Sequence, residues 1–464
     1  MTDEKIENEI SEFAKKLQEN ENEPLLSREK NQQIPRNLST LQKLSFGLGH
    51  VINDILGVLW FSYALIFLQI VARIPPTISA LLMFLGQFTD AAATPFIGIL
   101  IDKFGSKKRW NAAGVILIAS SFPFIFHNWN DALWYMPFYY ILPIIIFQIG
   151  WATVQISHLS MIPDMTIFLQ ERAELTSLRY IIFVCSNITI YIVAYFILQE
   201  SKMGALIEPR DGWKFEVVAI IAVSIGVICS IFFQSALKVP PTQKKSKSAF
   251  NTAIQTWRKL YEICSSSKLY LVAFIHTTSR LFHSLNLTYI PFLINETNMK
   301  NSGILAGAPF FNFTAALLSS VIVNLLSKKY VNNKIMFTAG TTFALLSCVC
   351  VYLDPSNSDD AGYIYSASVF CGIGSAMTVI TSLCIAANYI GKDTEYGAFI
   401  YGLITFSDKI LTGLIIFSIE SLKSSNIISS EHYYKFVLTF VNATLTMLGY
   451  IFLLLLPSSV CYST

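Results

Sequence analysis

The sequence predicts an all-α membrane protein with twelve transmembrane helices in two six-helix, pseudo-symmetric bundles. Of its 464 residues, 53% are hydrophobic and only 14% are charged, and the mean hydropathy is +0.52. A chain this apolar has more hydrophobic surface than a soluble fold of its size can bury. Apolar runs of about 20 residues, the length that crosses a bilayer as a helix, recur between short polar breaks. A basic segment near the middle separates six of these runs from six.

The apolar runs follow one another closely, and several contain Pro or Gly, which membrane helices tolerate. Spans are expected at about 44–70, 77–101, 110–127, 133–160, 178–198, 215–236, 269–294, 303–326, 335–353, 362–388, 398–421 and 434–457. The expected domains are a cytosolic tail at 1–40, an N-terminal bundle at 41–237, a basic cytosolic linker at 238–268, a C-terminal bundle at 269–457 and a cytosolic tail at 458–464. The first tail is polar and poor in aromatics, so we expect it to be disordered.

Basic residues concentrate in alternate loops, which sets the expected orientation in the membrane. Lys103, Lys107, Lys108 and Arg109 follow the second span, and further lysines lie in the linker at 238–268. Because lysine and arginine accumulate in cytosolic loops, these loops and both termini are expected in the cytosol. The basic patches are expected to contact anionic lipids of the bilayer. They are not expected to bind nucleic acid.

Two short segments resemble each other, and they fall in the fourth and tenth spans. They read GWATVQISHLS from Gly150 and GSAMTVITSLC from Gly374. Duplicated six-helix halves around a central cavity would place equivalent helices in this way, which is a common architecture of secondary transporters. Echoes of this length also arise by chance, so the repeat counts only together with the twelve expected spans.

The loop after the second span carries a motif. GILIDKFGSKKR, residues 98–109, fits the pattern G-x-x-x-D-[RK]-x-G-x-[KR]-[KR]-[KR]. This pattern resembles the loop between the second and third helices of the major facilitator superfamily. Asp102 can pair across the bundle, and the cations, including Arg109, can hold the loop at the cytosolic surface. Asp102 and Arg109 are therefore gating candidates; the plainer interpretation is a generic basic loop.

Longer segments extend this resemblance over both halves, from 41 to 457. GLGHVINDILGVLWFSYALIFL (47–68), FQIGWATVQISHLSMIPDM (147–165) and ITSLCIAANYIGKDTEYGAFIYG (380–402) look like the animal lysosomal and melanosomal cysteine importers of the same superfamily. The resemblance implies a secondary transporter that moves L-cysteine from the cytosol to the lumen by alternating access. Residue spacing alone does not select cysteine over another small solute. We expect a monomer.

The bacterial glycoside-pentoside-hexuronide cation symporters share the layout more distantly. That resemblance implies a cation site with carboxylates from the first and second helices, and Asp54 and Asp90 occupy matching positions. Thr94 and Gln155 stand where the further carboxylates would be, which weakens a sodium site and leaves proton coupling or gradient-driven movement. A cation-coupled sugar or other small-solute symporter is the alternative function. A non-transporting membrane sensor or chaperone is the alternative from another class.

Among the ionisable residues within the expected spans, the candidates are Asp54, Asp90, Arg179, Arg280, Asp408 and Lys409. A charged group in a lipid-facing position costs about 2.5–3.5 kcal/mol or more, so these side chains are expected to face the bundle interior. Arg179 and Arg280 offer planar guanidinium groups for a substrate carboxylate. Asp54 is the expected partner of a substrate ammonium or a proton, Lys409 is a further substrate-binding candidate, and Asp90 and Asp408 are coupling candidates. Alternatively, the charges pair with one another and fix helix packing, or Arg179 reaches the membrane surface.

Polar and aromatic residues complete the expected substrate site. His158 lies one turn after Gln155 on the same helix face, and an imidazole with a pKa near about 6.5 can respond to an acidic lumen. A hydrogen-bonded packing histidine is the alternative. Further candidates are Asn53, Tyr63, Trp151, Tyr289 and Thr381. Aromatic residues in membrane helices also serve as packing residues or interface anchors.

The sequence contains no pattern typical of an enzyme. It has no G-x-S-x-G elbow, H-E-x-x-H helix or phosphate-binding glycine loop. Its eight cysteines lack C-x-x-C spacing, which argues against a zinc or disulfide framework. We expect no catalytic activity, no metal and no cofactor.

The N-terminal tail contains ENEPLLS, in which Glu21 precedes Leu25 and Leu26. This arrangement resembles the acidic dileucine signal that clathrin adaptors bind. Together with the family resemblance, it indicates a lysosome or a related organelle. Of the Asn-x-Ser/Thr sequons, the one at Asn295 is expected in a luminal loop clear of the bilayer, where it is a glycosylation candidate.

Overall fold

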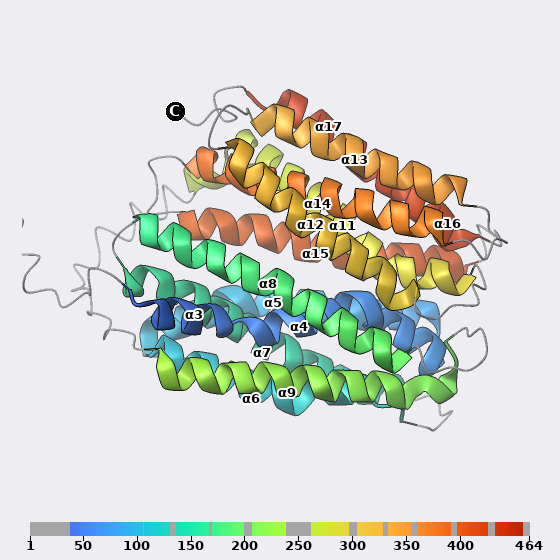
Figure 1. The fold of residues 1–464 in the computed structure, drawn as a ribbon, viewed down its shortest axis with the longest axis horizontal. Coiled ribbons are helices and arrows are strands. Elements are labelled where there is room, and N and C mark those ends of the chain that lie inside the picture. Colours follow the sequence, from blue (N-terminus) through green and yellow to red (C-terminus); the bar gives the residue numbers. More distant parts are fainter. Residues whose placement is uncertain are drawn as a thin grey trace, which may run out of the picture.

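The protein is described here by a computed structural model that covers residues 38–104, 106–129, 136–166, 169–198, 207–237, 261–296, 304–327, 333–354, 361–390, 397–425 and 432–457. Within these ranges all regular structure is helical. Figure 1 shows two bundles, one formed by the blue-to-green part of the chain and one by the yellow-to-red part. The first helix begins and the last helix ends at the same end of the bundles, which we call the terminal face; the other end is the opposite face.

The N-terminal half runs alternately away from the terminal face and back to it. Its elements are α3 (Thr40–Leu48), α4 (Val51–Leu59), the π-helical turns η1 (Trp60–Ala64) and η2 (Phe67–Val71), α5 (Pro76–Phe104), α6 (Lys107–Ile125), α7 (Met136–Met165), α8 (Leu169–Leu198), η3 (Pro209–Asp211) and α9 (Gly212–Ala236). The C-terminal half repeats the pattern. Its elements are α11 (Ser267–Glu296), α12 (Ile304–Ser327), α13 (Asn333–Leu353), α14 (Gly362–Ile390), α15 (Gly397–Ser424), α16 (Tyr433–Phe436), the π-helical turn η5 (Val437–Val441) and α17 (Asn442–Leu455).

The first membrane span is interrupted by irregular turns. α3 ends before Gly49, where a Cβ would collide with the Phe233 ring of α9, so glycine is required for this close approach. Beyond α4, the span continues through η1 and η2. π-helical turns are frequent at functional sites. In η1, the carbonyl of Phe61 accepts a hydrogen bond from Thr288 Oγ1 of α11 at 2.9 Å, which links the two halves.

Nine helical segments in the described ranges are long and apolar enough to cross a bilayer. The three remaining expected spans correspond to α6, α11 and α12. α11 is less apolar because it carries polar residues such as His276, Arg280 and Ser284. Polar side chains are tolerated at this depth where they face protein instead of lipid. The expectation of an all-helical membrane protein is confirmed.

Equivalent close contacts between helices hold each half together. A Cβ at Gly114 of α6 would lie 2.9 Å from the carbonyl oxygen of Gly150 of α7, and the reverse distance is 3.0 Å. In the C-terminal half, a Cβ at Gly374 of α14 would lie 3.0 Å from the carbonyl oxygen of Gly340 of α13. Gly150 and Gly374 are the first residues of the two similar sequence segments. Each copy of the short repeat therefore begins with a glycine that allows close helix contact, between α6 and α7 in one half and between α13 and α14 in the other.

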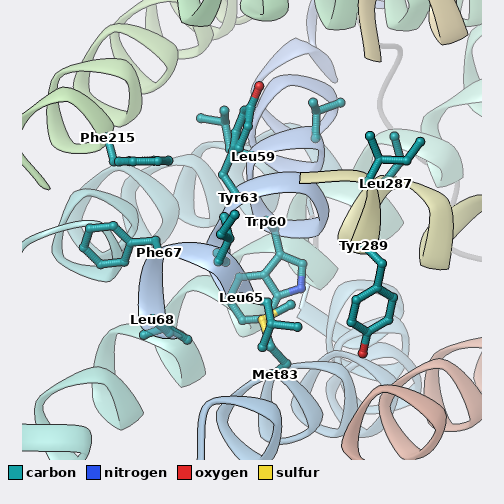
Figure 2. Close-up of a cluster of buried hydrophobic side chains, with 14 of the residues drawn as sticks. Leu59, Trp60, Tyr63, Leu65, Phe67, Leu68, Met83, Phe215, Leu287 and Tyr289 are labelled. Carbon is teal, nitrogen blue, oxygen red and sulfur yellow. The ribbon is translucent and has the colours of Figure 1, made fainter. Parts of the chain in front are cut away.

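The apolar core joins the two halves near the opposite face. One cluster of buried side chains includes Tyr63 and Phe215 of the N-terminal half together with Leu287, Tyr289 and Ile416 of the C-terminal half. We call this cluster the apolar seal. Figure 2 shows some of its side chains, which come from both halves. Among the described residues, the buried clusters nearest the terminal face each belong to a single half. This conformation is therefore closed at the opposite face, with separate cores at the terminal face.

Gly374→Ala is expected to destabilise the protein by about 1–3 kcal/mol, because the added methyl group overpacks the contact between α13 and α14. Thermal unfolding of the purified protein in detergent measures this effect. Gly402→Ala is the matched control, since no neighbouring atom lies within 4 Å of a Cβ at that position and alanine favours a helix interior by about 0.5–1 kcal/mol over glycine. A Tm for Gly374→Ala at or above that of the control would contradict the close contact.

Candidate functional site

A cavity of about 90 Å³ lies between the two halves. The N-terminal half contributes side chains from η1, α5 and α7, and the C-terminal half contributes side chains from α11 and α15. The lining residues are Trp60, Phe61, Gln87, Asp90, Gln148, Trp151, Gln155, Arg280, Ser284, Asp408, Lys409 and Thr412. Most of them are polar or charged, although the surrounding helices expose many large apolar side chains on their outer surfaces.

An ion pair at the cavity links one half to the other. Lys409 Nζ on α15 lies 2.7 Å from Asp90 Oδ2 on α5, and the two side chains are only 14% and 6% exposed. Thr94 lies one turn after Asp90 on the same face of α5, and its hydroxyl oxygen is 3.4 Å from Lys409 Nζ. The Lys409 ammonium therefore occupies the position next to Asp90 and Thr94 that a bound cation would need.

A second ion pair lies within the C-terminal half. Arg280 Nε on α11 is 3.4 Å from Asp408 Oδ2 on α15, and Thr412 Oγ1 donates to the other carboxylate oxygen at 3.4 Å. The Arg280 side chain is 35% exposed, so part of its guanidinium group is accessible. Successive residues on a helix point about 100° apart, which is why the adjacent Asp408 and Lys409 have partners on two different helices and do not pair with each other.

Half of the cavity lining was identified from the sequence, namely Asp90, Trp151, Gln155, Arg280, Asp408 and Lys409. The other half of the lining has no candidate from the sequence, namely Trp60, Phe61, Gln87, Gln148, Ser284 and Thr412. Gln87, Gln148 and Thr412 each lie one helical turn from an identified residue, so helical spacing could have found them. Trp60 and Phe61 carry no such signal, because their orientation depends on the π-helical turn η1.

Asp54 and Arg179 lie together, but outside the lining of this cavity. His50 joins them, since its Nδ1 is 2.6 Å from Asp54 Oδ1 and its Nε2 is 3.1 Å from an Nη atom of Arg179. The ring of His158 on α7 lies 5.3 Å from that of His50, and its Nε2 donates to the Phe46 carbonyl at 2.7 Å. We call His50, Asp54, His158 and Arg179 the His50 cluster. Both residues were expected at a central site; in this structure Asp54 lies one turn after His50, and its carboxylate accepts the imidazole N–H.

Four other candidates lie outside the cavity lining: Asn53, Tyr63, Tyr289 and Thr381. Asn53 Nδ2 donates to the carbonyl of Trp151 at 3.0 Å, which ties α4 to α7. The Tyr63 hydroxyl lies 3.5 Å from a backbone carbonyl of α12 and so spans the two halves. Thr381 donates to a carbonyl of its own helix at 2.6 Å, and Tyr289 belongs to the apolar seal. In this conformation Asn53, Tyr63 and Tyr289 hold helices together, whereas the hydroxyl of Thr381 bonds within α14.

A polar cluster at the opposite face adjoins the apolar seal; we call Gln69, Glu296, Glu420, Lys423 and Tyr434 the opposite-face cluster. Gln69 Nε2 of η2 donates to Glu420 Oε2 of α15 at 2.8 Å and so links the two halves. The Tyr434 hydroxyl donates to the same oxygen at 3.1 Å, and the Tyr434 backbone N–H donates to Glu296 at 3.1 Å. Lys423 Nζ lies 3.7 Å from the centre of the Tyr434 ring. Glu420 is fully buried. Its hydrogen bonds to Gln69 and Tyr434 therefore take the place of the hydrogen bonds to water that the carboxylate would form if this face opened.

The remaining candidates lie at helix ends or outside the described residues. Arg109 is exposed in the first turn of α6, whereas Lys107 forms an ion pair with Asp164 of α7 at 2.7 Å. Asn295 lies in the last turn of α11 with its Oδ1 buried, which corrects the expectation of a loop position, because the helix continues to Glu296. The residues Glu21, Leu25 and Leu26 and the side chain of Asp102 lie outside what the structure describes.

Comparison with known proteins decides the family. The family model of the Major Facilitator Superfamily matches residues 46–415 of this chain. The chain belongs to the major facilitator superfamily. Major facilitator superfamily domain-containing protein 12 of Mus musculus is 31% identical over 423 residues, covering 84% of this chain and 86% of the relative. The protein of the same name from Homo sapiens is 30% identical over 423 residues, with the same coverage of both chains.

A solved structure agrees with this fold. The crystal structure of a D-xylose-proton symporter aligns with a TM-score of 0.72 at 11% identity, covering 91% of this chain and 99% of that chain. As a member of the major facilitator superfamily, this chain is a multi-pass secondary transporter and not an enzyme. Among the described residues, no group of His, Cys, Asp and Glu side chains could hold a metal ion.

Lys409→Ala is expected to destabilise this superfamily member by about 3–5 kcal/mol, because Asp90 would remain buried without its partner. The double variant Asp90→Asn with Lys409→Gln removes both charges and is expected to cost less than Lys409→Ala alone. Thermal unfolding of the purified variants measures both effects. Arg210→Ala is the control, since Arg210 is 74% exposed in its pair with Glu208 and such surface pairs contribute about 0–1 kcal/mol. Greater destabilisation of the double variant would contradict the pairing.

Proposed function

We propose that this transporter moves L-cysteine from the cytosol into the lumen of a lysosome or a related organelle such as the melanosome. The observation that carries this proposal is the charge pattern of the central cavity, where two cations and two carboxylates line one small space. A free amino acid has a carboxylate and an ammonium group, so it needs a cation and an anion at close range. The sequence resemblance to lysosomal and melanosomal cysteine importers supports cysteine among the amino acids.

The size of the cavity supports a small cargo. A buried water needs about 10–15 Å³ of such space. The cavity of about 90 Å³ therefore has room for roughly six to nine groups of water size. A small solute such as cysteine suits a space of this size. The rings of Trp60, Phe61 and Trp151 suit a thiol side chain, because sulfur makes favourable contacts with aromatic rings.

Arg280 is the group best placed to bind the substrate carboxylate. Its bond to Asp408 uses Nε and is long, at 3.4 Å, which leaves the Nη groups for a two-pronged contact with a carboxylate. When the substrate carboxylate binds Arg280, the Asp408 carboxylate gives up part of its contact with Arg280 and forms a contact with the substrate ammonium instead. Every charge keeps a partner of opposite sign during this exchange, which matters because an unpaired charge in a buried site is strongly unfavourable.

Alternating access supplies the route for the substrate. The apolar seal closes the opposite face, and the separate cores at the terminal face suit a conformation that receives a solute there. Basic residues such as Lys107, Lys108 and Arg109 assign the terminal face, and with it both termini, to the cytosol. Release into the lumen then requires that the two halves separate at the apolar seal and at the bond between Gln69 and Glu420.

The N-terminal tail accounts for the proposed location. Glu21, Leu25 and Leu26 form a dileucine signal that a clathrin adaptor would bind, which would bring the protein to lysosomes or related organelles. The tail belongs to the cytosolic side in the proposed orientation, where adaptors act. This part of the proposal rests on the sequence, because these residues lie outside the described ranges.

Sodium-coupled transport is disfavoured by the position of Lys409. Its ammonium group lies 2.7 Å from Asp90 and 3.4 Å from the Thr94 hydroxyl. A sodium ion at the same carboxylate would be repelled by this positive charge and would lack the oxygen ligands that hard cations require. We therefore propose that cysteine transport needs no sodium and is driven by the cysteine gradient or by protons.

Arg280→Ala is expected to lower uptake of labelled L-cysteine into proteoliposomes about tenfold to a hundredfold, because hydrogen bonds to charged groups are worth about 1.5–3 kcal/mol. Arg280→Lys keeps the charge but loses the two-pronged geometry, so we expect an intermediate rate. Arg210→Ala is the matched control, because this arginine is exposed at the opposite face. Uptake is measured with a reductant that keeps the thiol free.

The same assay separates the alternatives. L-Serine is expected to compete weakly, and neither a hexose nor removal of sodium is expected to change cysteine uptake. Competition by a sugar without any uptake of cysteine would favour the sugar symporter. Binding of cysteine without uptake would favour a membrane sensor. Normal uptake by Arg280→Ala would contradict the assignment of the carboxylate site.

Glu420→Ala is expected to loosen the opposite face, because it removes the acceptor for Gln69. Hydrogen–deuterium exchange of the backbone at residues 67–71 and 433–436 measures this opening, and we expect it to be about tenfold faster than in the wild type. Glu420→Gln is the matched control, since its amide oxygen can still accept from Gln69. Unchanged exchange in Glu420→Ala would show that the apolar seal alone keeps this face closed.

A further inference from the structure

We infer that His50 is a positioning residue that holds Arg179 in place and releases it when the imidazole gains a proton. The effect on transport rests on the proposed function, whereas the effect on the fold does not. The cluster lies close to the central cavity: Gln155 of α7 lines the cavity, and His158, one turn further toward the terminal face, lies beside His50. A change in the cluster therefore reaches a helix that forms the cavity wall.

The two bonds of His50 fix its protonation state. The Asp54 carboxylate can only accept a hydrogen bond, so His50 Nδ1, 2.6 Å away, must carry the hydrogen. The same Nη atom of Arg179 lies 3.1 Å from His50 Nε2 and 3.4 Å from Nδ1, so the guanidinium group packs over the imidazole ring, with Nε2 as the nearer nitrogen. A guanidinium group can only donate, so this contact requires that Nε2 carry no hydrogen. The neutral imidazole therefore gives its N–H to Asp54 and presents an uncharged ring to Arg179.

His50 is the partner that determines where Arg179 lies. It is the hydrogen-bond partner of the guanidinium within the described part of the chain, and the Arg179 Nε atom is buried there without one. The bond ties α8, which carries Arg179, to the start of α4, which carries His50 and Asp54. Without an acceptor at His50, a buried guanidinium group would lose its hydrogen bond at a considerable cost in free energy.

A proton at His50 Nε2 would break this arrangement. It would remove the acceptor and place an N–H group and a positive charge against the Arg179 guanidinium. The charged and titratable groups that face His50 are Asp54 on its own helix, Arg179 on α8 and His158 on α7; Phe46 of α3 and Phe233 of α9 close the cluster with apolar rings. Asp54 balances one positive charge and not two, so Arg179 has to move away from the imidazolium.

His158 does not take over this role. Its Nε2 donates to the Phe46 carbonyl at 2.7 Å, and its Nδ1 is buried without a hydrogen-bond partner among the described residues. A second proton on His158 would therefore find no acceptor. Neutral His50 is the form that keeps α4 joined to α8, and this form is favoured when the terminal face meets a solution near neutral pH. Acidification is expected to weaken transport.

The test compares His50→Gln with His50→Phe in the full-length protein. Uptake of labelled L-cysteine into proteoliposomes is measured with equal pH on both sides, from about pH 7.5 to about pH 4.5, a range that extends well below the usual titration of histidine. Wild-type uptake is expected to fall severalfold as the pH is lowered. Gln offers both N–H donors and a carbonyl acceptor and does not titrate, so His50→Gln is expected to transport with a flat pH profile. His50→Phe is expected to lose about tenfold or more at every pH.

His127→Gln is the matched control. His127 also pairs with a carboxylate, Glu216 at 3.1 Å, but it is 41% exposed and lies near the opposite face. This variant is expected to keep the wild-type pH profile. A wild-type pH profile in His50→Gln, or normal uptake in His50→Phe, would overturn the inference.

A second measurement separates this inference from the proposed function. The Tm of the purified protein is compared between wild type and His50→Gln over the same pH range. Because a charged His50 breaks its bond to Arg179, the wild type is expected to lose Tm relative to His50→Gln as the pH falls. If the wild type takes up no cysteine at any pH, the proposed cargo is wrong, and the Tm comparison still decides the role of His50. A constant Tm difference would overturn the inference.

Discussion

The ion pair between Asp90 and Lys409 links the two halves of the protein at the point where they enclose the central cavity. A single charge at this depth would be strongly unfavourable, so each of these residues requires the other. The pair therefore constrains how the halves meet: α5 must present its Asp90 face to the Lys409 face of α15. The adjacent Asp408 points about 100° away from Lys409 around α15, so once α15 presents Lys409 to α5, Asp408 faces Arg280 of α11.

The two faces of the protein are held by different forces. Near the opposite face, the halves share an apolar core, and the opposite-face cluster at its edge adds a buried hydrogen bond between Gln69 and Glu420. Near the terminal face, each half has its own core in the described ranges. An apolar contact is not directional and can separate without leaving a charge unpaired, whereas Glu420 has to exchange its protein partners for water. The opposite face can thus open as a unit once water replaces these bonds.

The sequence was sufficient to predict the fold, because a membrane helix has to satisfy its backbone within about 20 apolar residues and each such run is visible in the chain. It was also sufficient to identify the charges at the cavity, since charges inside membrane spans are rare and face the protein interior. It did not predict which charges pair. That outcome depends on helix rotation, which placed Arg179 against His50 and left Arg280 at the cavity. The aromatic residues at the cavity depend on the π-helical turn η1, for which the sequence carries no simple pattern.

The charges at the central cavity and in the His50 cluster cancel in each group. At the cavity, Asp90 and Asp408 balance Lys409 and Arg280, and in the His50 cluster Asp54 balances Arg179 across a neutral imidazole. The proposed cargo, an amino acid zwitterion, also has no net charge, so its binding would leave the charge of the carrier unchanged when the two halves change position. A membrane potential then favours neither direction for the cargo itself. In such a carrier the direction of net transport follows the gradient of the solute, unless a proton is bound at one face and released at the other. If His50 gained a proton, Asp54 would face two positive charges, those of His50 and Arg179, and one of them would lack a partner.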